Sequence, residues 1–225
     1  MVYPKTRISR FEPRKGQRGF TLLELIVVVI IIAVLSVLAI PAVLNQLRDR
    51  RVENGALEIG ALYRNARMRA MARGGAVLVR FDGTVSPQGR VEVREALRGN
   101  VGGDPNCQQL PVSSCSLSTW VNGNPDNKLL SQFDPANRAE WNTLFLTMNG
   151  PPPANAGVQP NMDICFTPMG RAFVRFAQVG PFVPLTGVSK VTVARKAGGN
   201  QVGLARSVLV LPNGHARGGP ASAPP

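Results

Sequence analysis

The first long apolar stretch of this 225-residue chain runs from Phe20 to Leu44 and contains a single charged residue, Glu24. As a helix at about 1.5 Å per residue the segment is roughly 37 Å long, enough to cross the ~30 Å hydrocarbon layer of a membrane with some tilt. The pattern therefore predicts a membrane helix over residues 20–44.

Beyond this segment, apolar side chains recur at steps of four and three residues, as they do on one face of a helix. The stripe consists of Val52, Ala56, Ile59, Tyr63, Ala66 and Ala70, and several arginines lie off it. Gly74 and Gly75 then favour a helix end. We expect one helix from about Thr21 to Arg73, with residues 45–74 as an amphipathic part that lies against a globular domain.

Pro41 falls inside this predicted helix. It has no N–H to donate, and its ring crowds the carbonyl of Val37, so it should kink or locally melt the helix. Such a feature is either a simple kink near the membrane exit or a dedicated hinge.

Residues 75–212 change to short strand-like segments separated by turn formers. The expected strands are 76–81, 91–94, 143–148, 162–167, 172–178, 190–195 and 207–211. Several alternate apolar with polar residues, which favours antiparallel sheet packed on the helix and hence an α+β fold. A Gly-, Pro- and Asn-rich stretch at about 98–160 is expected to be an irregular insertion, and 213–225 a flexible tail.

A carboxylate near the centre of a membrane helix costs about 2.5 kcal/mol or more, so Glu24 calls for an explanation. One hypothesis is an ordinary signal anchor in which Glu24 reaches the headgroups. The order of the parts argues against it, because a secretory signal peptide is cut after its apolar region. Here the candidate cut, between Gly19 and Phe20, precedes the apolar run and would remove only the leader, residues 1–19.

The segment from Arg14 to Val27 resembles the class III signal of type IV pilins and pseudopilins, whose pattern is Gly, Phe, Thr, Leu, any residue and Glu before an apolar helix. The resemblance implies that a prepilin peptidase cuts after Gly19 and methylates the new N-terminal Phe20. It also implies that Glu24, the fifth mature residue, pairs with the N-terminal amine of a neighbouring subunit. Pro41 is at mature position 22, where many pilins also carry proline.

Charge predicts the orientation of the chain. The leader holds six basic side chains and one acidic one, a net charge of +5, which leaves +8 of the total +13 to the residues from Phe20 onward. By the positive-inside rule the leader stays cytoplasmic and the C-terminal domain is translocated. We expect a single-pass protein of the bacterial inner membrane whose C-terminal domain is periplasmic.

Three further segments resemble GspH/FimT-type minor pilins: Tyr63–Gly74 leading into a strand, the turn Phe166–Ala172, and the closing segment Ser207–Arg217. The resemblance implies a structural subunit that primes or caps a type IV filament. Its partners would be other pilin or pseudopilin subunits through the N-terminal helix, the prepilin peptidase, and the inner-membrane assembly platform. A type IV pilus and a type II secretion pseudopilus both remain open.

Some FimT-like proteins bind DNA through a C-terminal Gly-Arg-x-Arg turn. The matching positions here are Gly214, His215, Ala216 and Arg217, so a largely neutral histidine replaces one arginine. Phosphate binding scales with the number of fixed cations, so any contact of Arg217 with DNA should be weak.

Three cysteines fit an oxidising compartment, and three single pairings are open. Cys107 and Cys115 enclose a short polar loop and are the candidate disulfide, with Cys165 left on a strand. Cysteine and histidine spacing matches no common zinc pattern, and we expect no metal and no cofactor.

The alternative class is an enzyme, and the sequence gives little support for a catalytic function. No nucleophile elbow, phosphate loop or paired-acid motif stands out, and a single histidine limits acid–base chemistry. Asp82 beside Gly83 and Asp134 beside Pro135 are interpreted as turn carboxylates. We therefore expect no catalytic residues.

Overall fold

The computed structural model describes residues 19–85, 87–98, 110–151 and 157–219, with side chains at 38, 41, 42 and 110 left out. The leader before Gly19, Cys107 and the last six residues lie outside the described residues. Two compact units divide the chain, residues 1–44 and 45–225. The boundary coincides with the predicted end of the apolar segment.

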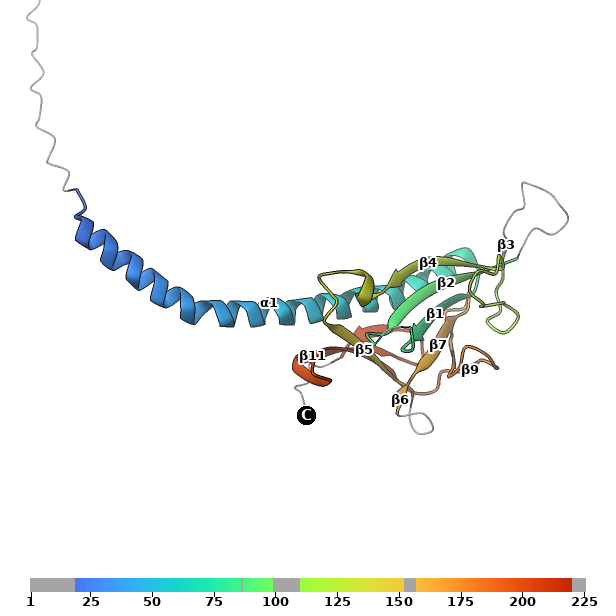
Figure 1. The fold of residues 1–225 in the computed structure, drawn as a ribbon. Helices are drawn as coiled ribbons and strands as arrows, with labels where there is room; N and C mark the ends of the chain where they lie inside the picture. The colour runs from blue at the N-terminus through green and yellow to red at the C-terminus, as the bar shows by residue number, and fades with distance from the viewer. Residues whose placement is uncertain (1–18, 86, 99–109, 152–156, 220–225) are drawn as a thin grey trace, which may run out of the picture. The chain divides into compact units, whose positions relative to one another are not determined.

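Helix α1 runs from Leu22 to Arg73, as the apolar pattern predicted, and contributes to both units (Figure 1). It ends at Gly74, which has a φ of +69° and donates its N–H to the carbonyl of Ala70 at 3.1 Å. The left-handed backbone that glycine adopts readily is what stops the helix here. Position 41 is assigned as helical, so the backbone is not melted there, and a kink at Pro41 stays a prediction.

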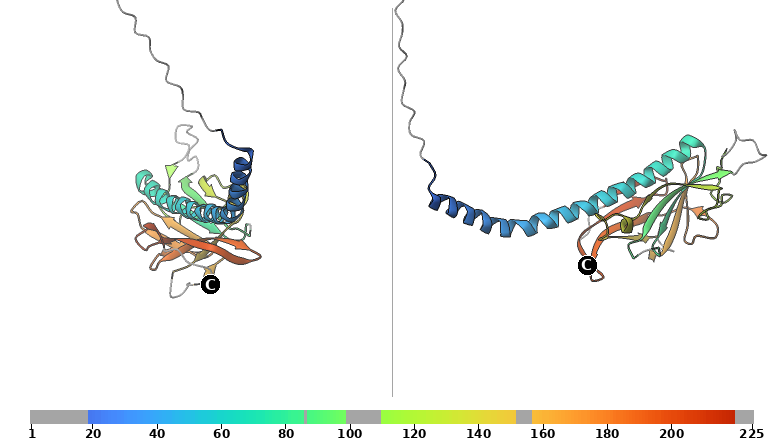
Figure 2. Two further views of the ribbon diagram at one scale, coloured as in Figure 1. Left: turned by 90° about the vertical axis from the view of Figure 1, so that its left-hand side faces the viewer. Right: turned by 45° about the horizontal axis from the view of Figure 1, so that its top comes forward.

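Two antiparallel sheets make up the rest of the second unit (Figures 1 and 2). In the larger sheet the order is β3-β2-β1-β7-β8-β9, and β4 also pairs with β2. Its strands are β1 (Val77–Asp82), β2 (Arg90–Arg98), β3 (Leu110–Pro111), β4 (Asn127–Phe133), β7 (Asn161–Phe166), β8 (Ala172–Arg175) and β9 (Val183–Pro184).

The smaller sheet has the order β12-β11-β10-β5-β6. Its strands are β5 (Leu144–Asn149), β6 (Val158–Gln159), β10 (Ser189–Ala197), β11 (Asn200–Val210) and β12 (Ala216–Gly218). The backbone N–H of Leu146 in β5 donates to the carbonyl of Gln88, in the β1–β2 turn, at 2.7 Å. This bond connects the two sheets, and together with the helix they give the expected α+β fold.

The main core lies between the 45–73 part of α1 and both sheets (Figure 2). The predicted stripe is confirmed, because all six of its residues are buried and belong to this core: Val52, Ala56, Ile59, Tyr63, Ala66 and Ala70. On β1, Val79 and Phe81 face the same core, whereas Leu78 belongs to a second cluster with Trp120 and Cys165. The larger sheet is therefore covered on both faces, which the alternating pattern alone did not predict.

The prediction of an irregular insertion at about 98–160 is wrong at residues 127–137. This stretch holds β4, which pairs with β2 from Asn127–Ala96 to Phe133–Val91, and a 3₁₀ turn at Pro135–Asn137. The strand expected at 143–148 is present as β5. Only the two end residues of β4 are buried, so the strand depends on hydrogen bonds to β2 more than on an apolar pattern.

The predicted flexible tail from residue 213 is also wrong up to residue 219. Strand β12 pairs with β11 through Ala216–Val210, Arg217–Leu209 and Gly218–Val208. Backbone hydrogen bonding thus fixes a segment whose composition favoured disorder. The part of the tail from residue 220 lies outside the described residues.

A search of the described residues finds no helix with the length and apolar character needed to span a membrane.

Candidate functional site

Gly19 and Phe20 precede α1, separated from it by Thr21, and Glu24 is in the first turn of the helix. The hydroxyl of Thr21 accepts a hydrogen bond from the backbone N–H of Glu24 at 3.2 Å. This is half of a capping box, in which Thr and a Glu three residues later satisfy N–H groups at a helix start. The Thr21–Glu24 spacing was therefore a helix-start signal that the sequence analysis missed.

Glu24 is exposed, and among the described residues no Lys, Arg or His nitrogen lies within ion-pair distance of its carboxylate. A carboxylate in the first turn is favoured by the positive end of the helix dipole. The Glu24 carboxylate thus lies on the helix close in sequence to Phe20, which is 82% exposed. Chemically it offers a fixed negative charge to a cation from outside the chain.

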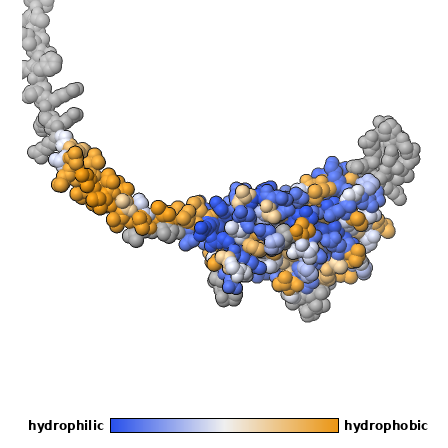
Figure 3. All heavy atoms as spheres, viewed as in Figure 1, coloured by the Kyte–Doolittle hydropathy of each residue, from blue (hydrophilic) through white to orange (hydrophobic). Residues whose placement is uncertain are grey.

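The helix that follows Glu24 exposes large apolar side chains around its circumference. Figure 3 shows this segment as hydrophobic on the face that is drawn. The exposed residues include Leu25, Ile26, Val29, Ile30, Ile32, Val34, Leu35, Val37 and Ile40. Burial of such side chains is worth roughly 1.5–3 kcal/mol each, so the segment is stabilised by any apolar surroundings it enters.

Residues 14–40 match the family described as the prokaryotic N-terminal methylation motif. The matched residues include Gly19, Phe20 and Glu24, and they end just before Pro41. The remaining residues of the chain lie outside this match.

One solved structure is similar to this chain, the crystal structure of the type IV minor pilin FimU from Pseudomonas aeruginosa (strain PAO1). The TM-score is 0.41 at 15% sequence identity, and the alignment covers 79% of this chain and 94% of that one. The search of curated proteins gave no match.

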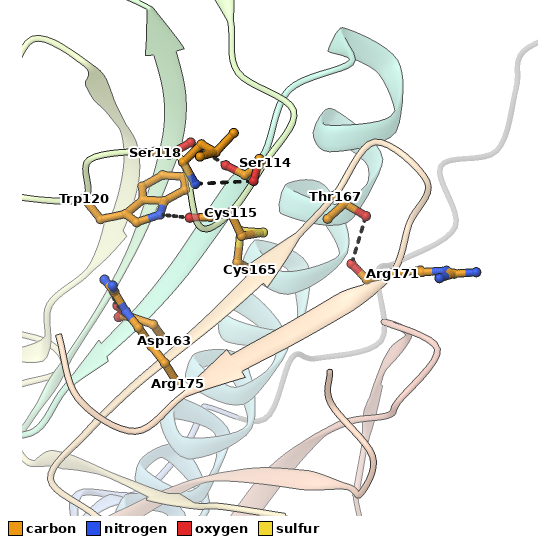
Figure 4. The surroundings of a disulfide bond; sticks show 10 residues. Ser114, Cys115, Ser118, Trp120, Asp163, Cys165, Thr167, Arg171 and Arg175 are labelled. Atoms are coloured by element: carbon orange, nitrogen blue, oxygen red, sulfur yellow. Dashed lines mark hydrogen bonds and ion pairs between the residues drawn. A yellow bond between two sulfur atoms is a disulfide. The ribbon is translucent and has the colours of Figure 1, made fainter. Parts of the chain in front are cut away.

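The predicted cysteine pairing is corrected by the structure, in which Cys115 is bonded to Cys165 across 50 residues of sequence (Figure 4). Cys165 in β7 lies opposite Leu78 in β1 and, like it, belongs to the second apolar cluster, where Cys115 also lies. Trp120 donates its indole N–H to the carbonyl of Cys115 at 2.9 Å. The disulfide therefore fastens the segment 112–121 over the outer face of the larger sheet.

Beneath that segment, charged side chains alternate in sign across four adjacent strands. Glu92 in β2 lies opposite Arg80 in β1, Arg80 opposite Asp163 in β7, and Asp163 opposite Arg175 in β8. We call these four buried residues the charge ladder. Arg80 also donates to the carbonyl of Trp120 at 3.0 Å. This hydrogen bond connects the charge ladder to the segment 112–121.

Burial alone would lower the pKa of Arg80. The hydrogen bonds and negative charge of Asp163, with the charges of Glu92 and Asp82, outweigh it and raise that pKa. Arg80 therefore stays charged, and its ion pair with Asp163 joins β1 to β7.

The two carboxylates interpreted as turn residues are confirmed as such. Asp82 accepts hydrogen bonds from the backbone N–H and the hydroxyl of Thr84, at 2.9 and 2.7 Å. Asp134 caps the 3₁₀ turn by accepting from the backbone N–H of Ala136 at 3.0 Å. Each carboxylate satisfies local donors, as expected for Asx turns.

Two turns singled out from the sequence meet at one helix residue. Arg67 of α1 donates to the carbonyl of Gly170, in the turn after β7, at 3.3 Å. A Cβ added to Gly214, in the turn before β12, would lie 2.9 Å from that carbonyl and 3.0 Å from Arg67 Nε. Beside them, His215 and Arg217 are both exposed, with Arg217 in β12. Weak DNA contact by Arg217 stays a prediction.

Proposed function

We propose that the protein is a structural subunit of a type IV filament, matured by cleavage after Gly19 and methylation of Phe20. The observation that carries the proposal is the methylation-motif match over residues 14–40, with Glu24 at the fifth mature position. Cleavage at this point creates an α-amine on Phe20, next to the start of the helix. That amine, with a usual pKa of about 7.7–8.0, is mostly protonated at neutral pH.

The proposed assembly step is charge pairing between subunits. In a bundle of parallel apolar helices, the amine of Phe20 on one subunit meets the carboxylate of Glu24 on its neighbour. An ion pair in apolar surroundings is costly to break, because removal of one partner leaves a buried, uncompensated charge. Pairing therefore favours one axial register of neighbouring helices over others.

We further propose that the segment 20–44 resides in the inner membrane before assembly, with the basic leader in the cytoplasm and the domain from residue 45 in the periplasm. The leader's +5 charge and the exposed apolar side chains of the helix support this placement. Both environments, lipid and bundle, cover the same apolar surface.

Within the filament, we propose the place of a minor pilin or pseudopilin that primes or caps assembly. The support is the resemblance of Tyr63–Gly74, Phe166–Ala172 and Ser207–Arg217 to GspH/FimT-type segments. A type IV pilus and a type II secretion pseudopilus fit this proposal equally. Tip adhesin or secretion-channel genes beside this one would separate the two.

The test is Glu24→Ala in the native organism, followed by measurement of processing, membrane insertion and incorporation. We expect cleavage and insertion to be unchanged, while the amount of this subunit in sheared filaments, or in the purified pseudopilus, falls by about tenfold or more. Glu53→Ala is the matched control, since Glu53 is also an exposed acid on α1 but lies in the second unit. Normal incorporation of the Glu24 variant would refute the pairing role.

Processing is tested separately at Gly19. A bulky residue, as in Gly19→Leu, should block cleavage and leave the leader attached, whereas Gly19→Ala should still be cut because the side chain stays small. Mass spectrometry of the purified chain reports both cleavage and the added methyl group on Phe20. An uncut wild-type chain would contradict the proposal.

A further inference from the structure

A pocket of about 330 Å³ lies between α1 and the turn that precedes β12. Its apolar lining comes from Ala61, Met68 and Ala216, and its polar lining from the residues around them: Arg64, Asn65, Arg67, Gly214 and His215. We call this the α1–β12 pocket. All of its lining belongs to the second compact unit, so one folded domain forms it.

Cations without carboxylate partners border the pocket. In the described part of the chain, neither Arg64 nor Arg67 has an acidic oxygen within ion-pair distance, and Arg67 is fixed only by its bond to the Gly170 carbonyl. In contrast to Arg64 and Arg67, two other arginines of the same helix, Arg69 and Arg73, form ion pairs with the buried Glu95. The pocket therefore carries positive charge that no carboxylate of the described part of the domain pairs with.

Methionine is exposed on the same side of the helix. Met68 is 55% exposed and Met71 42% exposed, and Met71 Sδ lies within 3.1 Å of where a Cβ on Gly170 would be. Met169, in that same turn, is 79% exposed. Methionine and arginine are both enriched at protein interfaces, and the flexible thioether adapts to varied apolar partners.

These features point to a protein partner more than to nucleic acid. None of the described residues that line the pocket is Phe, Tyr or Trp, so they offer no aromatic ring on which an unpaired base could stack. The partner should be acidic, because two cations need compensation and the chain from Phe20 onward carries a net +8 that opposes close approach of a second copy.

We propose that the α1–β12 pocket docks an acidic segment of a partner protein, with an apolar side chain in the cavity and a carboxylate between Arg64 and Arg67. The inference is independent of the proposed role of the N-terminal helix, since every residue it uses lies between 61 and 71 or in the turns of residues 167–171 and 211–217. Failure of the Glu24 test would leave it standing.

The experiment is site-specific photo-crosslinking of the full chain in its native cells. A photo-reactive amino acid replaces Met68, and a matched control carries it at Val179, an exposed apolar site that does not line the pocket. Crosslinked products are mapped by mass spectrometry to the peptide reached. We expect position 68, and not position 179, to reach an acidic segment of another protein.

Charge reversal then tests the carboxylate contact. Arg64→Glu should lower the yield from position 68 by about tenfold or more, because like charges would face each other. Arg51→Glu, which changes another exposed arginine of α1 outside the pocket, should leave the yield unchanged. Lysine in place of the mapped carboxylate should restore the yield with Arg64→Glu. Arg64→Gln, which keeps a neutral polar side chain, should give an intermediate yield, and circular dichroism verifies that each variant is folded.

A product that joins position 68 to nucleic acid, to lipid or to a second copy of this chain would overturn the proposal. So would identical products from positions 68 and 179, or a yield that Arg64→Glu does not change.

Discussion

Arg80 and Asp163 face each other across β1 and β7 through two hydrogen bonds of 2.9 and 3.0 Å, with 4% and 1% of their side chains exposed. Arg175 adds two further contacts to the same carboxylate, at 2.8 and 2.7 Å. One buried anion therefore holds two buried cations, and the charge ladder depends on it more than on any other member.

Asp163→Asn should destabilise the fold strongly, because it removes the negative charge of the carboxylate that both buried guanidinium groups contact. We expect a loss of about 3–5 kcal/mol in the free energy of unfolding, measured by denaturant titration of the full chain in non-ionic detergent. Glu53→Gln is the control, since the Glu53–Arg206 pair is 4.0 Å long and half-exposed, and should cost less than about 1 kcal/mol. Similar losses in the two variants would contradict the importance of the ladder.

The Cys115–Cys165 disulfide should account for much of the stability of the folded domain. A crosslink across 50 residues restricts the unfolded chain, and its removal by Cys115→Ser should cost about 2–5 kcal/mol. The melting temperature with and without reductant measures this, and Cys107→Ser should leave both values as in the wild type. If Cys107→Ser abolished the effect of reductant, the pairing seen here would be wrong in solution.

Tyr63→Phe should be nearly neutral at pH 7 and protective at high pH. The Tyr63 hydroxyl is buried and has no hydrogen-bond partner among the described residues, so its removal should change stability by less than about 1 kcal/mol. Burial, with a smaller contribution from the charge of Asp163, raises the pKa of Tyr63 above its ordinary value of about 10.

The sign of the pH effect follows from proton binding. Above pH 10 the unfolded chain loses the tyrosine proton while the folded chain keeps it, so this contribution to stability is complete below pH 10 and falls as the pH rises. We expect the variant Tyr63→Phe to become more stable relative to the wild type above pH 10. The free energies of unfolding of both proteins, measured from pH 8 to 11, test this. A constant difference would exclude the raised pKa.

Gly214→Ala should destabilise the packing of two turns, those of Gly170 and Gly214, against Arg67. Both Gly214 and Gly123 have a φ of +78°, where a side chain costs about 1–2 kcal/mol, but only at Gly214 would the new Cβ meet other atoms. Gly123→Ala thus isolates the backbone strain, and Gly214→Ala should cost about 1–3 kcal/mol more. Equal melting temperatures for the two variants would show that the turns do not pack as described.

The periodic parts of this fold could be predicted from sequence, because their signals are local. The stripe from Val52 to Ala70 repeats at helical spacing, and the ends of α1 are marked by Thr21 and Gly74. Strand β10 alternates cleanly and was expected at 190–195. Each of these patterns follows from the geometry of one element and the burial of one face.

The features that were missed depend on residues distant in sequence. Strand β4 has little apolar pattern and forms because β2 offers it an unpaired edge, and β12 forms because β11 does. The choice of Cys165 over Cys107 depends on which face of β7 meets the segment 112–121. At the N-terminus, Gly19, Phe20 and Glu24 were predicted as site residues from a contiguous motif, and this stays a prediction. The α1–β12 pocket joins residues about 150 positions apart and had no local signal.

The Cys115–Cys165 bond also determines what a protease can release. The residues between the two cysteines include β4 from the larger sheet and β5 from the smaller one. A single cut anywhere in that span leaves two chains that are still joined through sulfur, and each retains strands hydrogen-bonded to the other. Proteolysis within this span would therefore cut the backbone of the domain without releasing a fragment.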